Sequence, residues 1–430
     1  MVKSATTMET QLLDARSLIG GQWKTATQTA PVVDPYRREP IGRVPVGTEQ
    51  DVDAAVDAAA AAAAKAAQMP GYKRAELLRR VGELLDERAE GIAELMARET
   101  GKAVKDALGE IKRSKDTLSL SAEEAIRIEG AHIPLEGSEM GAGKLAFMVR
   151  FPVGVVAAIT PYNAPFNLAC HKLAPALAAG NTVVLKAPPQ SPLVVYRLVE
   201  LFHDAGVPPG FINLIYGGVE VGRRLVRHPK VNFITFTGST RAGADIHANA
   251  GLRRVALELG GNGPTIVEPD TDIESAALQC ARNSTRLAGQ SCISVQNVYA
   301  HESIADNLIA AMTKHLGALK LGDPLDPATD VGTLIDEAAA QRVEAWVEEA
   351  IKQGAKRVVG GKRNGAQYPP TLLTDVKPDM KVVCDEVFGP VVNVIRYRDI
   401  AEPIAQINAS PYGLQCGLFT RSNAVTFRVL

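Results

Sequence analysis

The chain is most constrained by short apolar segments that alternate with helical segments from about residue 149 onward. Runs rich in valine and isoleucine at 153–159 and 182–185 are each followed by a helical segment, with glycine or proline at the junctions. Apolar strands that alternate with helices form a parallel sheet covered by helices on both faces. The alternation starts again after Gly260-Gly261. We therefore expect an α/β protein with two successive α/β units and a cleft between them.

Two segments near the N-terminus do not fit this alternation. Residues 54–68 are rich in alanine, which has the highest helix propensity, and the next segment has a leucine and valine stripe at helical spacing. Both segments predict helices. Residues 129–146 are rich in glycine and lack a helical stripe. We expect them to form a hairpin that projects between the first helices and the sheet.

The composition excludes several classes of protein. The 47 basic and 48 acidic side chains balance, so no overall field favours nucleic acid or an anionic membrane as a partner. No apolar run reaches the roughly 18 residues that a membrane span needs. The five cysteines are scattered, without CxxC pairs or metal-ligand spacing. This pattern predicts reduced thiols, no metal site and a cytoplasmic protein.

Two glycine-rich segments carry groups with catalytic chemistry. Gly289-Gln290-Ser291-Cys292 lies downstream of Leu257-Glu258-Leu259-Gly260-Gly261. A free cysteine usually behaves as a small buried hydrophobe, but its thiolate is a nucleophile where the surroundings lower its pKa. Glu258 lies between two leucines, where burial would raise its pKa toward that of a general base. Together the segments favour an enzyme that attacks a carbonyl through sulfur.

Three further features are ambiguous when taken alone. The run from Phe236 to Gly243 is a strand that leads through glycine into a helix, which suits a pyrophosphate, although a simple turn is about as common. Lys186, at a strand end, is either a solvated lysine or a ligand of a cofactor ribose. Asn163 is better explained in isolation as a helix N-cap, but its amide is also able to donate to an oxyanion.

Six motifs together resemble one known family in their order and spacing. They are Thr160-Pro161-Tyr162-Asn163-Ala164-Pro165, Leu185-Lys186, Phe236-Thr237-Gly238-Ser239, Leu257-Glu258-Leu259-Gly260-Gly261, Gly289-Gln290-Ser291-Cys292 and Glu386-Val387-Phe388-Gly389-Pro390. From about Leu18 to its last residue the sequence resembles the NAD(P)-dependent aldehyde dehydrogenase superfamily. Gly260-Gly261-Asn262 and the run at 167–172 are similar to the branch that acts on small polar aldehydes, such as lactaldehyde or phosphonoacetaldehyde.

The resemblance implies an architecture and a catalytic mechanism. It implies a Rossmann-like NAD(P)-binding domain (1–133 and 153–258), a β-hairpin for oligomerisation (134–152) and an α/β catalytic domain (259–430). Cys292 would add to the aldehyde, and Asn163 with the N–H of Cys292 would form the oxyanion hole. Glu258 would activate the water that hydrolyses the thioester, which yields a carboxylic acid.

The resemblance also implies a set of cofactor-binding residues. These are Thr160, Pro161, Lys186, Pro189, Gly238, Ser239, Glu386 and Phe388. Lys186 would bind the adenosine ribose, Glu386 the nicotinamide ribose, and Phe388 would position the ring, with Gly238 and Ser239 near the pyrophosphate. Pro189 stands where NAD-preferring relatives often have glutamate, so a 2′-phosphate is not repelled and the cofactor is NAD or NADP. The substrate entrance would be lined by Tyr162, Ala164, Phe166, His171 and Ser291.

One departure from the family concerns the end of the chain. The sequence stops at Leu430, inside what resembles a late helix, whereas family members continue for several dozen residues. A C-terminally incomplete catalytic domain is therefore expected, with a homodimer or homotetramer if the missing tail is present. Two alternatives stay open: a CoA-acylating relative, which the presence of Glu258 disfavours, and a truncated non-catalytic protein that binds a dinucleotide.

Overall fold

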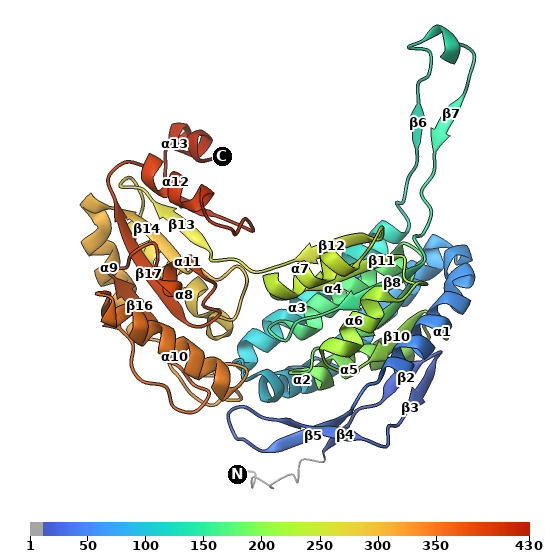
Figure 1. Ribbon diagram of the computed structural model, residues 1–430, viewed down its shortest axis with the longest axis horizontal. Helices are drawn as coiled ribbons and strands as arrows, with labels where there is room; N and C mark the ends of the chain where they lie inside the picture. The colour runs from blue at the N-terminus through green and yellow to red at the C-terminus, as the bar shows by residue number, and fades with distance from the viewer. Residues whose placement is uncertain (1–11) are drawn as a thin grey trace, which may run out of the picture.

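The computed structural model describes residues 12–430 and has two α/β lobes, with a long hairpin that projects from the first (Figure 1). A seven-stranded sheet with the order β12-β11-β8-β9-β10-β2-β3 forms the first lobe. Five neighbouring strands are parallel, and two short antiparallel strands complete one edge. These strands are β8 (Val155–Ile159), β9 (Thr182–Lys186), β10 (Ile212–Ile215), β11 (Phe233–Thr237), β12 (Arg254–Glu258), β2 (Ser17–Ile19) and β3 (Gln22–Lys24).

Helices cover both faces of this sheet, as the unbroken apolar strands predict. In β8, Val156 packs in the core beneath α2, α4 and α5, whereas Val155 packs in the core beneath α1, α6 and α7. Successive residues of a strand point to opposite faces, so a strand that is buried on both sides is apolar throughout. The helices are α1 (Glu49–Gln68), α2 (Gly71–Thr100), α3 (Val104–Ala125), α4 (Pro165–Ala178), α5 (Pro192–Asp204), α6 (Val219–Arg227) and α7 (Thr240–Asn249).

The second lobe contains a six-stranded sheet with the order β15-β16-β17-β14-β13-β18. All pairs are parallel except β15 with β16. Its strands are β13 (Pro264–Val267), β14 (Asn297–His301), β15 (Lys356–Val359), β16 (Thr371–Thr374), β17 (Val391–Tyr397) and β18 (Gly417–Phe419). Its helices are α8 (Ile273–Thr285), α9 (Glu302–Gly317), α10 (Glu337–Lys352), α11 (Lys381–Cys384), α12 (Ala401–Asn408) and α13 (Asn423–Val429). Both lobes confirm the predicted α/β class.

Two smaller β elements lie outside the main sheets. A three-stranded sheet near the N-terminus joins β1 (Leu13–Asp14), β5 (Pro40–Pro45) and β4 (Thr29–Val33). The projecting hairpin pairs β6 (Ala131–Ile133) with β7 (Ala146–Met148), so its first strand precedes the expected start at residue 134. Within residues 12–430, no helix combines the length and the apolar character that crossing a membrane requires.

Candidate active site

The chain passes from the first sheet to the second through a short glycine-rich segment (Figure 1). This segment follows Glu258, the last residue of β12, and ends at Pro264, the first residue of β13. The backbone N–H of Gly261 donates to the Glu386 carboxylate at 3.2 Å. A Cβ atom on Gly261 would lie only 2.4 Å from the carbonyl oxygen of Cys292. The crossing segment therefore packs against both motifs, and no side chain fits at residue 261.

The loop that carries Cys292 has an unusual backbone. After α8, three successive residues adopt left-handed conformations, with φ values of 55° at Leu287, 53° at Ala288 and 71° at Gly289. Non-glycine residues pay strain in this region, and such strain is characteristic of functional loops. A Cβ atom on Gly289 would lie 2.0 Å from the carbonyl oxygen of Gly389. The Cys292 loop is thus held tightly against the segment that follows Glu386.

Asn163 joins the first lobe to the Cys292 loop. It lies between β8 and α4, and its side-chain amide donates to the carbonyl oxygen of Gln290 at 2.9 Å. The side chain of Gln290 is itself fixed, because it accepts from the N–H of Ile335 at 2.9 Å and donates to the carbonyl of Leu287 at 3.2 Å. Asn163 and Cys292, expected to act together, are brought to the same junction between the lobes.

The surroundings of Cys292 raise the pKa of its thiol. Burial has the largest effect, and the negative charge of Glu386 adds to it, while the backbone N–H groups of Cys292 and Ile293 act in the opposite direction. Desolvation therefore outweighs hydrogen bonding to the thiolate, and the surroundings do not by themselves activate this thiol as a nucleophile. The thiol lines a cavity of about 310 Å³ between the glycine-rich crossing segment and residues 407–416.

Glu258 is exposed, which corrects the expectation that it is buried in an apolar strand. The reason is that β12 is the edge strand of its sheet and has alternating exposure. The charge of Glu258 still opposes the lowering of the pKa of His171 and of Lys172, and it raises that of Cys292. The ammonium of Lys172 donates to two threonine hydroxyls of β11, and burial lowers its pKa to about 8. The charge of Glu258 therefore influences His171, Lys172 and Cys292.

A second cavity, of about 390 Å³, lies at the carboxyl ends of β8, β9 and β11 in the first lobe. Six of the eight residues expected to bind the cofactor line it: Thr160, Pro161, Lys186, Pro189, Gly238 and Ser239. The hydroxyl of Ser239 caps α7 by accepting from the N–H of Ala242 at 3.3 Å. Burial lowers the pKa of Lys186 to about 8. A helix N-terminus and a buried amine beside one cavity fit an anionic dinucleotide.

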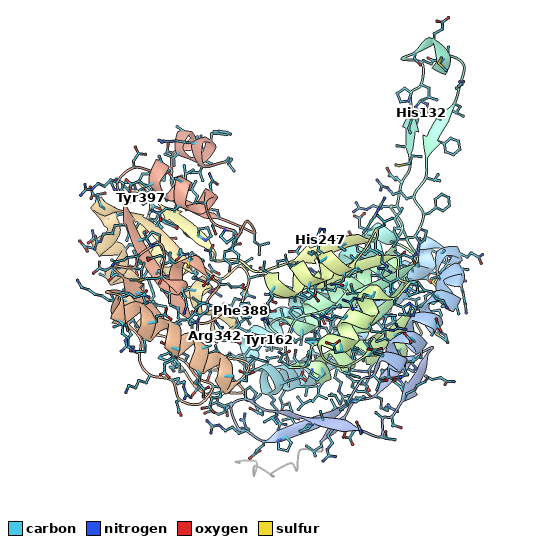
Figure 2. All side chains as sticks on the ribbon, viewed as in Figure 1. His132, Tyr162, His247, Arg342, Phe388 and Tyr397 are labelled. Carbon is cyan, nitrogen blue, oxygen red and sulfur yellow. The ribbon has the colours of Figure 1, made fainter. Side chains whose placement is uncertain are left out.

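The other two expected cofactor residues, Glu386 and Phe388, come from the second lobe. The ring of Phe388 contacts that of Tyr162 edge to face, with 5.9 Å between the ring centroids (Figure 2). Tyr162 lines the cofactor cavity, so this contact connects the cavity to the second lobe. Burial raises the pKa of the Glu386 carboxyl, although the N–H of Gly261 and the charge of Arg342 oppose that effect.

The expected substrate entrance requires a correction at Phe166. Its side chain is fully buried in the core of the first lobe, because it lies in the first turn of α4 and packs toward the sheet. The cavity at Cys292 is instead lined in large part by the turn after α12, which includes Tyr412 and Gln415. The sequence contains a signal for that turn, Ser410-Pro411-Tyr412-Gly413, but nothing in it points toward Cys292.

Two buried glutamates are not indicated by the sequence. Glu99 accepts hydrogen bonds from two backbone N–H groups in the first turn of α5, and Glu110 accepts from two in the first turn of α4. Lys102, also buried, forms a salt bridge with Glu110. Charged residues in helices and in the connections between them are usually solvated, so the sequence gives no sign that these three are buried.

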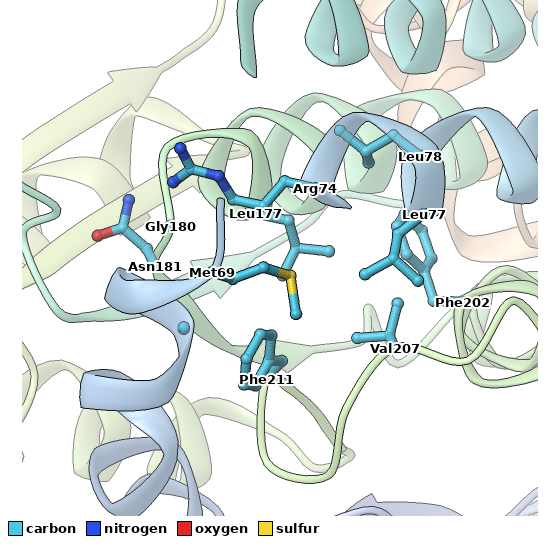
Figure 3. A pocket seen from close by; sticks show the side chains of 11 residues that line it. Met69, Arg74, Leu77, Leu78, Leu177, Gly180, Asn181, Phe202, Val207 and Phe211 are labelled. Atoms are coloured by element: carbon cyan, nitrogen blue, oxygen red, sulfur yellow. The ribbon is translucent and has the colours of Figure 1, made fainter. Parts of the chain in front are cut away.

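A much smaller void lies inside the first lobe and is separate from both cavities. Met69, Leu177, Phe202 and Phe211 surround it, with Arg74 at its edge (Figure 3). Its volume of about 10 Å³ has room for at most one water molecule. It is therefore a packing defect too small for a substrate.

Comparison with known proteins agrees with this geometry. Residues 23–430 match the aldehyde dehydrogenase family. The chain is 46% identical over 412 residues to 3-sulfolactaldehyde dehydrogenase of Priestia megaterium, covering 96% of this chain and 86% of that protein. It is 38% identical to NADP-dependent glyceraldehyde-3-phosphate dehydrogenase of Streptococcus equinus, covering 96% and 87%.

A solved structure supports the same assignment. The crystal structure of lactaldehyde dehydrogenase from Escherichia coli superimposes with a TM-score of 0.94 at 34% identity, covering 97% of this chain and 89% of that one. The two-lobed fold, the cofactor cavity and the loop of Cys292 thus occur in a chain with extensive similarity to known dehydrogenases. We conclude that the chain belongs to the aldehyde dehydrogenase family, whose general reaction is the NAD- or NADP-dependent oxidation of aldehydes to acids.

Proposed function

We propose that this chain oxidises a short aldehyde that carries an anionic group, with Cys292 as the nucleophile. The observation that supports the proposal most strongly is the junction of the lobes. There the amide of Asn163 lies 2.9 Å from the carbonyl of Gln290, two residues before Cys292. A nucleophile and a hydrogen-bond donor held at one junction are the minimum that addition to a carbonyl needs.

In the proposed reaction, the sulfur of Cys292 bonds to the aldehyde carbon as the thiol gives its proton to solvent water. The oxygen becomes an oxyanion that accepts hydrogen bonds from Asn163 and from the N–H of Cys292. A bound nicotinamide would supply the hydride acceptor for this adduct, and loss of the hydride would leave a thioester on Cys292. Glu258 takes a proton from water as the water attacks the thioester, which releases the acid and restores the cysteine.

The residues of the cofactor cavity would hold the dinucleotide. We assign Lys186 to the adenosine ribose, Ser239 and the N-terminus of α7 to the pyrophosphate, and Glu386 to the nicotinamide ribose. Pro189 adds no negative charge to the cavity, so a 2′-phosphate would meet no repulsion at that residue. This favours a protein that accepts NADP as well as NAD.

The proposed substrate class is based on the relatives. The two curated relatives named above act on 3-sulfolactaldehyde and on glyceraldehyde 3-phosphate, aldehydes that carry a sulfonate and a phosphate group. The cavity of about 310 Å³ at Cys292 suits a molecule of this size. A panel of 3-sulfolactaldehyde, glyceraldehyde 3-phosphate, lactaldehyde and propanal, tested with both cofactors, is expected to favour the first two. Preference for propanal would contradict the proposed substrate class.

Two variants test the chemistry with the best aldehyde of that panel. Cys292→Ala is expected to abolish NAD(P)H formation, whereas the control Cys384→Ala, at an exposed cysteine of α11, retains it. Glu258→Gln is expected to give a burst of NAD(P)H without sustained turnover, because the thioester forms but is not hydrolysed. Full steady-state activity in either active-site variant would reject its assigned role, and acyl-CoA formation on addition of CoA would favour the acyl-transferring alternative.

We also propose that the hairpin of β6 and β7 assembles copies of this chain into a homodimer or homotetramer. Its apolar side chains are exposed, including Phe147 at 69% and Phe151 at 80%. Exposed apolar surface next to unpaired strand edges is typical of surfaces that associate. The five cysteines, all unpaired, are consistent with a reducing compartment such as the cytoplasm.

A further inference from the structure

A buried ion pair lies directly behind Asn163. Lys102 follows Gly101, the residue that ends α2, and Glu110 lies in the second turn of α3. Their side chains are 3% and 0% exposed, and the ammonium of Lys102 is 2.5 Å from one carboxylate oxygen of Glu110. Burying two charges costs solvation free energy that their attraction often fails to recover, so an apolar pair would serve packing equally well. The other polar contacts of these two side chains therefore indicate why a charged pair is present here.

The second carboxylate oxygen of Glu110 caps α4. It accepts from the backbone N–H groups of Phe166 at 2.9 Å and Asn167 at 3.0 Å. The helix needs this cap from elsewhere, because its own N-cap residue is Ala164, which has no acceptor in its side chain. A negative charge at a helix N-terminus is also favoured by the helix dipole. Glu110 thus fixes the start of α4 immediately after Asn163.

Lys102 fixes the other side of the same segment. Its ammonium donates to the carbonyl oxygen of Asn163 at 2.7 Å, in addition to its bond with Glu110. The backbone from Asn163 to Asn167 is therefore held by one charged group at each end. The side chain of Asn163 then extends from this clamped backbone to the carbonyl of Gln290 in the Cys292 loop.

We propose that Lys102 and Glu110 are positioning residues that hold the amide of Asn163 where it stabilises the oxyanion formed on the Cys292 adduct. The inference depends on the role proposed above for Asn163. Neither residue touches the reacting atoms. They restrict the backbone that carries Asn163, so that its amide is already in position to donate to the oxyanion. A preorganised donor lowers the barrier because it does not have to reorganise during the reaction.

A double-mutant cycle tests the inference. The pair is replaced by Lys102→Met with Glu110→Gln, so that no unpaired charge stays buried and the amide oxygen of the new glutamine is still able to cap α4. This clamp variant is made alone and in the Asn163→Ala background. The control is Lys115→Met with Asp86→Asn, which removes an exposed ion pair between α3 and α2. Each protein is assayed for the rate of the first NAD(P)H-forming turnover, for KM of the cofactor and for thermal unfolding.

Asn163→Ala is expected to slow the first turnover by about 10²- to 10³-fold, the usual loss of an oxyanion donor. The clamp variant is expected to slow it by about 10- to 100-fold, as a displacement of about 1 Å does. In the Asn163→Ala background the same replacement is expected to cost less than about threefold, because the donor it positions is gone. The KM of the cofactor is expected to stay within about twofold of the parent value in Asn163→Ala, in the clamp variant and in their combination.

The possible failures are distinguishable. The inference is overturned if the clamp variant slows the first turnover equally in both backgrounds, or if a folded clamp variant keeps the parental rate. Either result leaves the role of Asn163 intact. A parental rate in Asn163→Ala instead overturns the proposed function of that residue. If the clamp variant does not fold, Glu110→Asp alone takes its place in the cycle. It keeps both charges of the buried pair but withdraws the carboxylate from α4 by one methylene, and a smaller loss that again disappears without Asn163 is expected.

Discussion

Replacing Gly289 with alanine is expected to displace the Cys292 loop and to slow catalysis strongly. A Cβ atom there would lie 2.0 Å from the carbonyl oxygen of Gly389, and ordinary van der Waals contact begins at 3.4 Å. One loop must therefore move by more than about 1 Å, since tightly packed interiors have no slack to absorb the overlap. A shift of about 1 Å in reacting groups costs on the order of 10²-fold in rate.

The same replacement destabilises the fold in two ways. Alanine in the left-handed region costs about 1–2 kcal/mol, and overpacking adds about 1–3 kcal/mol. Gly206→Ala is the matched control, because Gly206 also has a left-handed backbone (φ 84°) but a Cβ atom there would meet nothing within 4 Å. The control is expected to lose only the conformational part of the stability and none of the activity.

Steady-state NAD(P)H formation and urea unfolding on both variants separate the two contributions. If Gly289→Ala matched Gly206→Ala in both measurements, the contact between the Cys292 loop and Gly389 would not constrain the site. If Gly289→Ala lost stability but retained its kcat, the Cys292 loop would have moved without disturbing the nucleophile. Either result refutes the argument that close packing at this glycine fixes the position of Cys292.

Three other predictions follow from the charges and exposed surfaces. The charge of Glu386 helps to raise the pKa of Cys292, so Glu386→Gln is expected to lower that pKa. Labelling of Cys292 by iodoacetamide, measured by peptide mass spectrometry, should then occur at lower pH than in the parent protein. An unchanged pH profile would contradict this. The Kd of NAD, which lacks the titrating 2′-phosphate of NADP, is expected to rise as the pH passes through about 8, because Lys186, with its pKa of about 8, loses its charge there. Lys186→Arg is expected to give a flat profile, and a Kd that rises toward lower pH instead would count against Lys186. Phe147→Asp is expected to reduce the assembled mass in light scattering, and an unaltered mass would exclude the hairpin as an interface.

Much of the fold could be predicted from the sequence because local signals and packing agree. α10 (Glu337–Lys352) and β17 (Val391–Tyr397) belong to the second α/β unit that the sequence predicts after Gly260-Gly261. For α10, Asp336 caps the helix by accepting from the N–H of Ala339, and glycine follows the helix closely. The alternation of strands and helices fixed the α/β class, since both faces of each sheet had to be covered.

The errors at the candidate site have physical causes that local sequence does not contain. Glu258 was expected to be buried because leucines flank it, but β12 turned out to be an edge strand, and strand order is decided by contacts between distant segments. The raised pKa of Cys292 comes first from burial and then from the charge of Glu386, which lies far along the chain, so the residues next to the cysteine do not indicate it. Glu110 lies in α3 and Lys102 in the connection before it, and the neighbouring sequence does not show their burial, because it depends on how α3 packs against α4.

The caps supplied by Glu99 and Glu110 have a consequence for altering this protein. Where the residue before the first turn carries the cap in its own side chain, replacing it with alanine costs about 0.5–2 kcal/mol, so it tolerates little change. Here α4 begins after Ala164 and α5 after Ser191, and neither of these residues caps its own helix. The loops that precede Ala164 and Ser191 reach the cofactor cavity, and they do not have to supply the caps of the helices that follow them. Mutant libraries at these connections should yield folded enzymes with new cofactor or aldehyde preferences more often than libraries at self-capped helices.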